Sequence, residues 1–529
     1  MNFHHLLSPL LVAVPLAGAL CVALLPSRNR KTLFSLAFVF CAIEAVLGIA
    51  GFVMFDGTNP NEQFTFARPW FNLPASAGTV VPVAFHFGID GLSILLIALS
   101  GLLAPILLLS AYGHIEKRTK EFLFWTLVML AGMQGVFLAR DLVLFYLFWE
   151  ISLIPLYFII GVWGGPRRIY ATIKFFIYTF AGSVLMLIAL LYMAYTMGTV
   201  DIHELSTRDL GLREQLYCFG AFALAFAIKV PMIPFHTWLP DAHVEAPTAG
   251  SIVLAGVLLK MGTYGFLRLG IGMFPAAAIE AAPWLAALGA IGIVYGSFLA
   301  FGQRDMKKLV ACSSVAHMGT IVVGLFALNG AGLRGSILQM INHGLSTGLL
   351  FFLIGVLYER RHVREISEYG GIARVVPAFA VLLSVATFSS IGLPGLNGFP
   401  GEFLCLKGAF DFNPWIGAAA ALGTVLGAVY MLSMLRRVIY GPITRGENQK
   451  LTDLNAREWV AATLFIIPIV WIGVEPSRFI KPTEATVDHL VLRIEKGRKS
   501  LAAAEIENNI KVADAIINDT TSETKGEAR

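Results

Sequence analysis

The chain has 529 residues, of which 57% are hydrophobic and only 14% are charged, with a formal net charge of +5. A soluble globular protein carries about 25% charged residues, so this chain has too little polar surface to cover itself in water. The composition excludes a string of soluble domains and predicts an all-α polytopic membrane protein. The positive residues are spread over short loops, which argues against a nucleic-acid-binding protein.

The five cysteines lie in or beside apolar runs, and no two have CxxC spacing: Cys21, Cys41, Cys218, Cys312 and Cys405. The sequence therefore predicts neither a disulfide framework nor a metal or iron–sulfur site. The first apolar run, from Leu6 to Leu25, is longer than the core of a signal peptide. A basic cluster follows it, so we expect it to be retained as the first membrane span.

A spanning helix needs about 20 mostly apolar residues, and fourteen segments meet this requirement. In chain order they are 5–26, 32–54, 89–111, 121–138, 141–163, 174–197, 216–234, 247–269, 283–303, 308–329, 335–357, 377–414, 415–435 and 458–474. Prolines or glycines interrupt the seventh and the twelfth, so we expect both helices to be discontinuous.

These spans predict a chain in five parts. The parts are helices 1–3 in 1–111 with an outer loop at 55–88, five-helix repeats at 121–269 and 283–435, a last helix at 458–474, and a charged tail at 476–529. Because each repeat has an odd number of helices, tandem copies insert in opposite orientations. Such inverted repeats, with broken helices at matching positions, recur in transporters.

Two stretches of the chain lie outside the spans. The loop at 55–88 contains short alternating pieces, which predict a β-hairpin. In the tail, four apolar residues have helical spacing: Val487, Leu490, Val491 and Ile494. This spacing favours an amphipathic helix that clasps a neighbour, and a disordered end after about residue 500 is the open alternative.

Loop charge indicates the orientation. Lys and Arg concentrate in cytoplasmic loops. Of the 39 Lys and Arg residues, 21 lie in or beside the loops that follow odd-numbered spans, and 6 in those that follow even-numbered spans. We therefore expect both termini on the side away from the cytoplasm, which is the periplasm for a bacterial inner membrane.

Several ionisable residues lie within the spans, where a central charge costs about 2.5–3.5 kcal/mol on insertion scales. They are Glu150, Lys229, Lys260, His317, His343, Glu402 and Lys407. Residues of this kind face a bundle interior or a wet cavity and mark ion pathways. We therefore predict a proton-transfer row, with His236 and Lys407 as accessory residues and with no catalytic or cofactor-binding residue.

Each of these residues also has a structural interpretation that stays open. Glu150 could belong to a buried structural ion pair, and Lys229 could lie beside a simple proline kink, since Pro231 and Pro234 follow it. The two histidines could be satisfied core residues. Glu402 could belong to a re-entrant structural loop, in which Lys407 either pairs with it or marks the outer end of the path.

Six segments resemble the antiporter-like subunits of respiratory complex I, and most closely the subunit M branch, the counterpart of mitochondrial subunit 4. They are HFGIDGLSILLI, FWEISLIPLYFIIG, KVPMIPFHTWLPDAHVEAPTAGSIVLAGVLLKMGTYG, SSVAHMG, INHGLSTGLLFFLIGVLYERR and LPGLNGFPGEF, within about 85–475. The resemblance implies fourteen helices, inverted repeats and proton pumping coupled to quinone reduction. It also implies that subunits L and N lie alongside.

The resemblance assigns roles to the buried residues. Glu150 matches the family's acid in span 5, Lys229 its pumping lysine and Lys260 its central lysine. His317 and His343 match its polar axis, and Glu402 matches the terminal group that is lysine in subunits L and N. The resemblance places NADH, FMN, iron–sulfur clusters and quinone in partner subunits and no cofactor in this chain. The charged tail from about 497 to 529 departs from the pattern.

Three rival functions share parts of this pattern. A subunit of a multi-subunit Na⁺/H⁺ antiporter would purify without iron–sulfur and flavin subunits, and a membrane-bound hydrogenase subunit would purify with nickel. In a structural scaffold, the buried charges would only fix how the helices pack.

Overall fold

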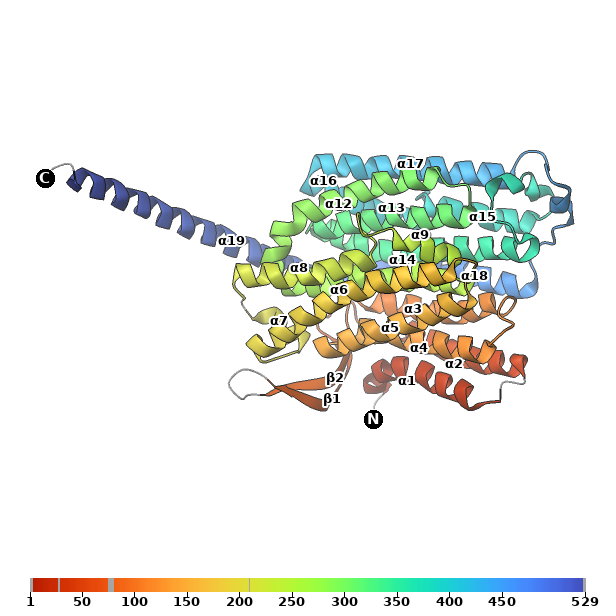
Figure 1. Cartoon of the computed structure of the whole chain (residues 1–529), viewed down its shortest axis with the longest axis horizontal. Helices are drawn as coiled ribbons and strands as arrows, with labels where there is room; N and C mark the ends of the chain where they lie inside the picture. Colours follow the sequence, from red (N-terminus) through yellow and green to blue (C-terminus); the bar gives the residue numbers. More distant parts are fainter. Residues whose placement is uncertain (1–2, 27–28, 75–79, 209, 527–529) are drawn as a thin grey trace.

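The computed structural model describes residues 3–26, 29–74, 80–208 and 210–526, with side chains described from 4 to 503. Its helices lie side by side in one bundle (Figure 1). A β-hairpin lies at one end of the bundle, and the long last helix leaves from the same end. We call this the hairpin end and the other the opposite end.

The N-terminal part begins with two helices and the hairpin. Its elements are α1 (Phe3–Leu24), α2 (Arg30–Met54), β1 (Gln63–Pro74), β2 (Val80–Ile89) and α3 (Ile94–Ala111). The strands are antiparallel, with Gln63 opposite Ile89 at one end of the register and Pro74 opposite Val80 at the other. Val81 and Val83 are buried between polar or exposed neighbours, as the alternation predicted. The predicted hairpin is therefore present.

The first predicted repeat contains a helix that stops inside the bundle. Its elements are α4 (Thr119–Leu138), α5 (Leu142–Trp163), α6 (Arg168–Met197), α7 (Ile202–Thr207), α8 (Leu212–Lys229), α9 (Trp238–Glu245), α10 (Thr248–Val253), η2 (Leu254–Leu258), α11 (Leu259–Gly265) and η3 (Phe266–Ile271). Helix α8 ends at Lys229 because Pro231 and Pro234 have no N–H to continue it. The Trp238 indole N–H donates to the freed carbonyl of Ile228 at 2.9 Å, which satisfies the broken end.

The second repeat contains the other break. Its elements are α12 (Pro275–Phe301), α13 (Met306–Phe326), α14 (Gly330–Arg361), η4 (Ile366–Glu368), η5 (Ile372–Arg374), α15 (Pro377–Ser390), α16 (Gly398–Phe412) and α17 (Pro414–Ile439). Between α15 and α16 the chain turns at Gly392 and Gly395, whose φ angles of +74° and +90° favour glycine. Both predicted discontinuities are confirmed.

Three elements complete the chain: η6 (Gly446–Lys450), α18 (Ala456–Val474) and α19 (Ser477–Gly526). Helix α19 lies across the hairpin end, packed on α12 and α14, and then extends away from the bundle (Figure 1). Val487, Leu490 and Ile494 are at most 5% exposed, so the predicted amphipathic face is real. The backbone of α19 is helical to Gly526.

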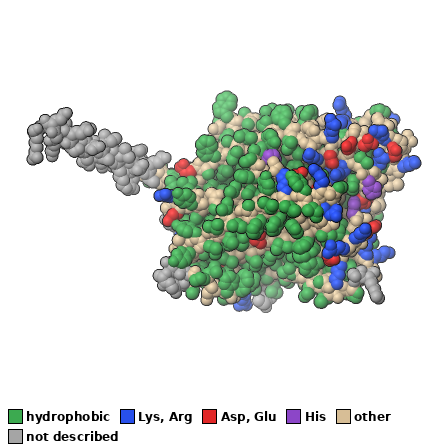
Figure 2. Space-filling model, in the orientation of Figure 1, with side chains coloured by type: hydrophobic (Ala, Val, Ile, Leu, Met, Phe, Trp, Pro, Cys, Tyr) green, Lys and Arg blue, Asp and Glu red, His purple; other side chains and the backbone are tan. Residues whose placement is uncertain are grey.

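Twelve helices of the described residues are long and apolar enough to span a membrane. The two remaining predicted spans, 216–234 and 377–414, are the broken helices, so the fourteen predicted spans are all accounted for. Several helices extend beyond their predicted bounds, and α14 covers Gly330–Arg361 where 335–357 was predicted. Figure 2 shows a mostly hydrophobic face, with Lys, Arg, Asp and Glu gathered at the opposite end.

The packing of α19 predicts the effect of truncating Ile494, which is 1% exposed. Replacing it by alanine should weaken docking by about 2–5 kcal/mol, because a buried cavity remains. Limited proteolysis of membranes should then cut α19 faster. Leu492 lies on the same helix and is 63% exposed, so Leu492→Ala is the matched control. Equal cleavage of the two variants would contradict the packing.

Candidate functional site

Lys260 lies at the centre of the bundle and is completely buried. Its Nζ donates to the carbonyl oxygen of Ala255 and lies 2.6 Å from Nδ1 of His343 on α14. Helices that carry residues 83 positions apart in the chain thus place two ionisable groups in direct contact. The amine has no carboxylate partner among the described residues, and its side-chain contact is the imidazole of His343.

The backbone around Lys260 explains why the Ala255 carbonyl is free. In an α-helix the N–H of Leu259 would bond that carbonyl four residues back. Here η2 is a π-helical turn, and the N–H of Leu259 bonds Leu254 and Val257 instead. A second π-helical segment, η3, begins six residues after Lys260. The span predicted at 247–269 is present, with two π-helical segments inside it, and such bulges are frequent at functional sites.

The row continues from His343 into the second repeat. The rings of His343 and His317 lie 5.6 Å apart between centroids. Nδ1 of His317 lies 3.8 Å from Oε1 of Glu402, and its Nε2 lies 3.3 Å from the hydroxyl of Ser390. Lys260, His343, His317 and Glu402 therefore form one buried chain of ionisable groups that crosses from α11 through α14 and α13 to α16.

The Glu402 end of the row borders a small polar cavity. The polar residues that line it are His317, Thr320, Ser390, Glu402, Thr424 and Tyr430. Its lining is polar, and its free space is about that needed to hold a single water molecule beside the carboxylate.

Lys229 and Glu150 lie at the broken end of α8. Nζ of Lys229 lies 5.1 Å from the centre of the Trp149 ring, a favourable cation–π contact in a buried site. Glu150 follows Trp149 on α5 and is half-buried, and its Oε1 lacks a hydrogen-bond partner among the described residues. The two groups form no direct ion pair in the described part of the chain, so the structural ion-pair interpretation does not fit.

The end of α8 also lies against the span that carries Lys260. A Cβ built at Gly262 would lie 3.1 Å from Cβ of Lys229 and closer still to Val230. Glycine therefore permits the close approach of α8 to α11. The backbones of the two lysine-bearing segments are in contact two residues from Lys260.

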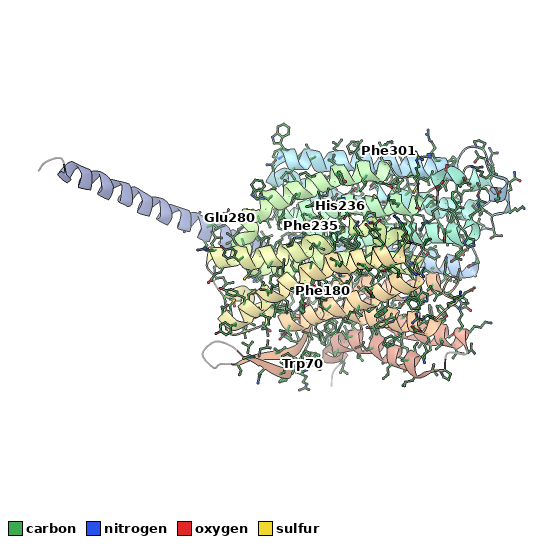
Figure 3. The ribbon with its side chains drawn as sticks, viewed as in Figure 1. Trp70, Phe180, Phe235, His236, Glu280 and Phe301 are labelled. Atoms are coloured by element: carbon green, nitrogen blue, oxygen red, sulfur yellow. The ribbon has the colours of Figure 1, made fainter. Side chains whose placement is uncertain are left out.

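The two accessory residues do not join the row. Lys407 is exposed and pairs with Asp411 at 2.7 Å, so of its two interpretations the pairing with Glu402 does not fit. The reason is helical geometry, because Asp411 lies one turn along the same exposed face of α16. His236 is buried beside Phe235, midway along the bundle (Figure 3), with its ring edge-on to Tyr295 at 5.3 Å.

The sequence-based prediction of buried ionisable residues did not include Glu44 and His243. Glu44 is fully buried on α2 and accepts a hydrogen bond from Gln134 of α4 at 2.8 Å. An acid in the predicted span 32–54 was the available signal, as it was for Glu150. His243 on α9 is fully buried and stacks on Phe351 at 4.6 Å, and neither ring nitrogen has a partner among the described residues. It lay in a predicted loop, so no hydropathy signal pointed to it.

A cluster of charges lies at the hairpin end of the first repeat. Asp90, in the turn after β2, lies 2.5 Å from Nη2 of Arg268 and 3.5 Å from Nη2 of Arg140. Arg140 also pairs with Glu62 at 2.8 Å. Burial opposes ionisation of Asp90, but the two guanidinium groups outweigh it and lower the pKa of Asp90 to about 2. These groups therefore stay charged throughout the physiological pH range.

A titratable pair lies at the surface of this cluster. Nδ1 of His86 on β2 lies 3.0 Å from Oδ2 of Asp201, and Nε2 lies 3.8 Å from Glu62. The hydrogen bond to Asp201 raises the pKa of His86 above its ordinary value, although burial and Arg140 oppose the rise. The hairpin is thus tied by this pair to the start of α7.

Comparison with known proteins identifies the class. Residues 139–427 match the family model described as NADH:quinone oxidoreductase/Mrp antiporter, transmembrane. The chain is similar to NADH-quinone oxidoreductase subunit M of Rhodobacter capsulatus, with 43% identity over 525 residues, 96% of this chain and 100% of the relative.

Solved structures agree with this match. One chain of respiratory complex I from Thermus thermophilus superposes with a TM-score of 0.80 and 33% identity, covering 92% of this chain and 99% of that one. A chain of the Mrp complex from a Dietzia species superposes with a TM-score of 0.79 and 20% identity, covering 94% and 100%, which shows a shared fold.

The chain is thus an antiporter-like multi-pass membrane subunit. Within that class, it belongs to the family of NADH-quinone oxidoreductase subunit M, a part of the proton-translocating oxidoreductase complex. The family that the sequence motifs indicated is therefore confirmed.

The His86 pair predicts a pH dependence of the hairpin. A raised pKa means that the pair stabilises the hairpin fully below the ordinary His value of about 6.5 and that this stability is lost as the pH rises through the raised value. The backbone amides of residues 80–89 should therefore exchange hydrogen more slowly at about pH 5.5 than at about pH 8.5, once the pH dependence of the intrinsic exchange rate has been divided out. In His86→Gln the difference should disappear. An unchanged difference in that variant would contradict the assignment.

Proposed function

We propose that this subunit moves protons through two half-paths that meet in the buried row. The observation that carries the proposal is the close buried succession of Lys260, His343, His317 and Glu402, spaced 2.6 Å between Nζ and Nδ1, 5.6 Å between ring centroids and 3.8 Å between Nδ1 and Oε1. Four ionisable groups at this depth are costly, and such groups mark proton relays when they line up in a bundle interior. The cavity beside Glu402 supports a wet end to the row.

The proposed transfer begins at Glu150 and Lys229. A charge on Glu150 favours a charge on Lys229 across the intervening distance, and neutralising Glu150 removes that support. Lys229 then releases its proton toward Lys260, whose segment it touches through Gly262. From Lys260 the proton passes to His343, then His317, then Glu402, and leaves toward the hairpin end.

Energy for this transfer comes from quinone reduction in other subunits of the complex. In the proposal, NADH, FMN, iron–sulfur clusters and quinone are bound by those partner subunits and not by this chain. Antiporter-like subunits L and N are the proposed neighbours on either side. The lysine- and arginine-rich opposite end would face the cytoplasm of a bacterial inner membrane, with both termini in the periplasm.

The rival functions keep their own tests. The Mrp chain shares the fold at 20% identity, so a stand-alone Na⁺/H⁺ antiporter is a relative and a weaker candidate. A hydrogenase would reveal nickel in the purified complex. A scaffold predicts that Glu150, Lys229 and Glu402 can be neutralised together without loss of transport, provided that the complex still assembles.

The proposed transfer predicts the effect of neutralising Glu150. Replacing it by glutamine should abolish proton pumping by membrane vesicles, because the charge that supports Lys229 is lost, while NADH oxidation by an artificial acceptor continues. Glu280, an exposed acid at the hairpin end of α12, provides the control Glu280→Gln (Figure 3). Normal pumping in Glu150→Gln would refute the assigned role.

A second prediction separates the Glu402 carboxylate from the turn beside it. A Cβ at Gly392 would collide with Oε2 of Glu402, whereas a Cβ at Gly395 meets no described atom within 4 Å. Both glycines have positive φ, so alanine strains both positions by a similar amount. Gly392→Ala should lower quinone-linked proton pumping severalfold, and Gly395→Ala should retain it. Equal losses would show that backbone strain, and not displacement of Glu402, is responsible.

A further inference from the structure

Tyr264 lies between Lys260 and the charge cluster at the hairpin end. It is one helical turn after Lys260 on α11, and residues four apart share a helix face. The side chain is completely buried, and its ring packs edge-on against Phe137 at 5.3 Å. The side chain thus occupies the helix face that leads from Lys260 to the hairpin end.

The Tyr264 hydroxyl uses its one donor and both acceptor positions in hydrogen bonds, so none is free to pass on a proton. The hydroxyl donates to the carbonyl of Phe137 at 3.2 Å. It accepts from Nη1 of Arg140 at 3.1 Å and from Nε of Arg268 at 3.1 Å. A phenolic oxygen has one proton and two lone pairs, so the donor and both acceptors are in use.

The groups beyond Tyr264 cannot relay a proton either. Arginine does not release its proton in proteins, so Arg140 and Arg268 present two fixed positive charges. Asp90 is held ionised between them and accepts from the backbone N–H groups of Leu92 and Ser93 as well. Fixed charges that line a narrow path act as barriers to protons.

We infer that Tyr264, fixed by Arg140 and Arg268, seals the direct route from Lys260 to the hairpin end, so that a proton on Lys260 passes to His343. We call these three residues the hairpin-end seal. The inference rests on the proposed function, because it takes Lys260 to be a proton carrier. It adds the reason for lateral transfer: the row is open at the Glu402 cavity and closed at Tyr264.

The test uses the whole complex reconstituted in liposomes. Passive proton entry is followed with a trapped pH dye under a potassium diffusion potential, without NADH. Tyr264→Phe removes one oxygen and should raise the leak about tenfold, the factor that corresponds to 1.4 kcal/mol. Tyr192→Phe makes the same change at an exposed tyrosine, whose hydroxyl lies 3.4 Å from Glu214, and should not leak.

Arg268→Gln provides a second opening of the seal at a partly buried position, in case Tyr264→Phe assembles poorly. Assembly of each variant is checked by the yield of complex and by its NADH oxidation with an artificial acceptor. Wild-type leak rates in both variants would overturn the seal.

A double variant separates this inference from the proposed function. If the leak of Tyr264→Phe passes through Lys260, adding Lys260→Ala should return it to the wild-type value. A leak that persists in the double variant would overturn the seal, because protons then bypass Lys260. Loss of pumping in Lys260→Ala alone, together with a tight Tyr264→Phe, would leave the proposed function standing and remove only the seal.

Discussion

The cost of holding ionisable groups in a lipid-surrounded bundle governs this structure. Lys229, Lys260, His343 and Glu402 are nearly or fully buried, and each is placed where another polar or aromatic group meets it. Lys229 faces the ring of Trp149, and Lys260 meets the carbonyl of Ala255 and the imidazole of His343. Glu402 borders a cavity. None of these partners neutralises its group outright. These contacts are how the structure tolerates the burial of the four groups.

The irregular backbone is the means by which these partners are supplied. Helix α8 stops beside Pro231, and Trp238 satisfies the freed carbonyl of Ile228. The π-helical turn η2 releases the Ala255 carbonyl to Lys260. The glycine turn between α15 and α16 brings Gly392 against the carboxylate of Glu402. Each departure from a regular helix lies next to an ionisable side chain, as expected where broken helices line a path.

Hydropathy, proline position and charge were sufficient to predict the fold and the row. Those signals are local, so the spans, both breaks and all four members of the row could be predicted from the sequence. The hairpin-end seal could not, because Arg140 and Arg268 lie at two separate span ends, each looks like an ordinary boundary charge, and nothing in the sequence connects either of them to Tyr264. The π-helical turns also escaped, since Leu254–Leu258 is as apolar as any α-helical turn.

The position of Lys229 over Trp149 has a consequence for how a charge can be stored. An aromatic face attracts an ammonium ion but has no site that can take its hydrogen. The cation–π attraction between Lys229 and the Trp149 ring therefore does not depend on whether nearby acids are ionised. A carboxylate in the same place would hold the ion more firmly and would also be quenched by it. In the proposed transfer, the indole would hold the cation without engaging Glu150, which would stay available to control the lysine electrostatically.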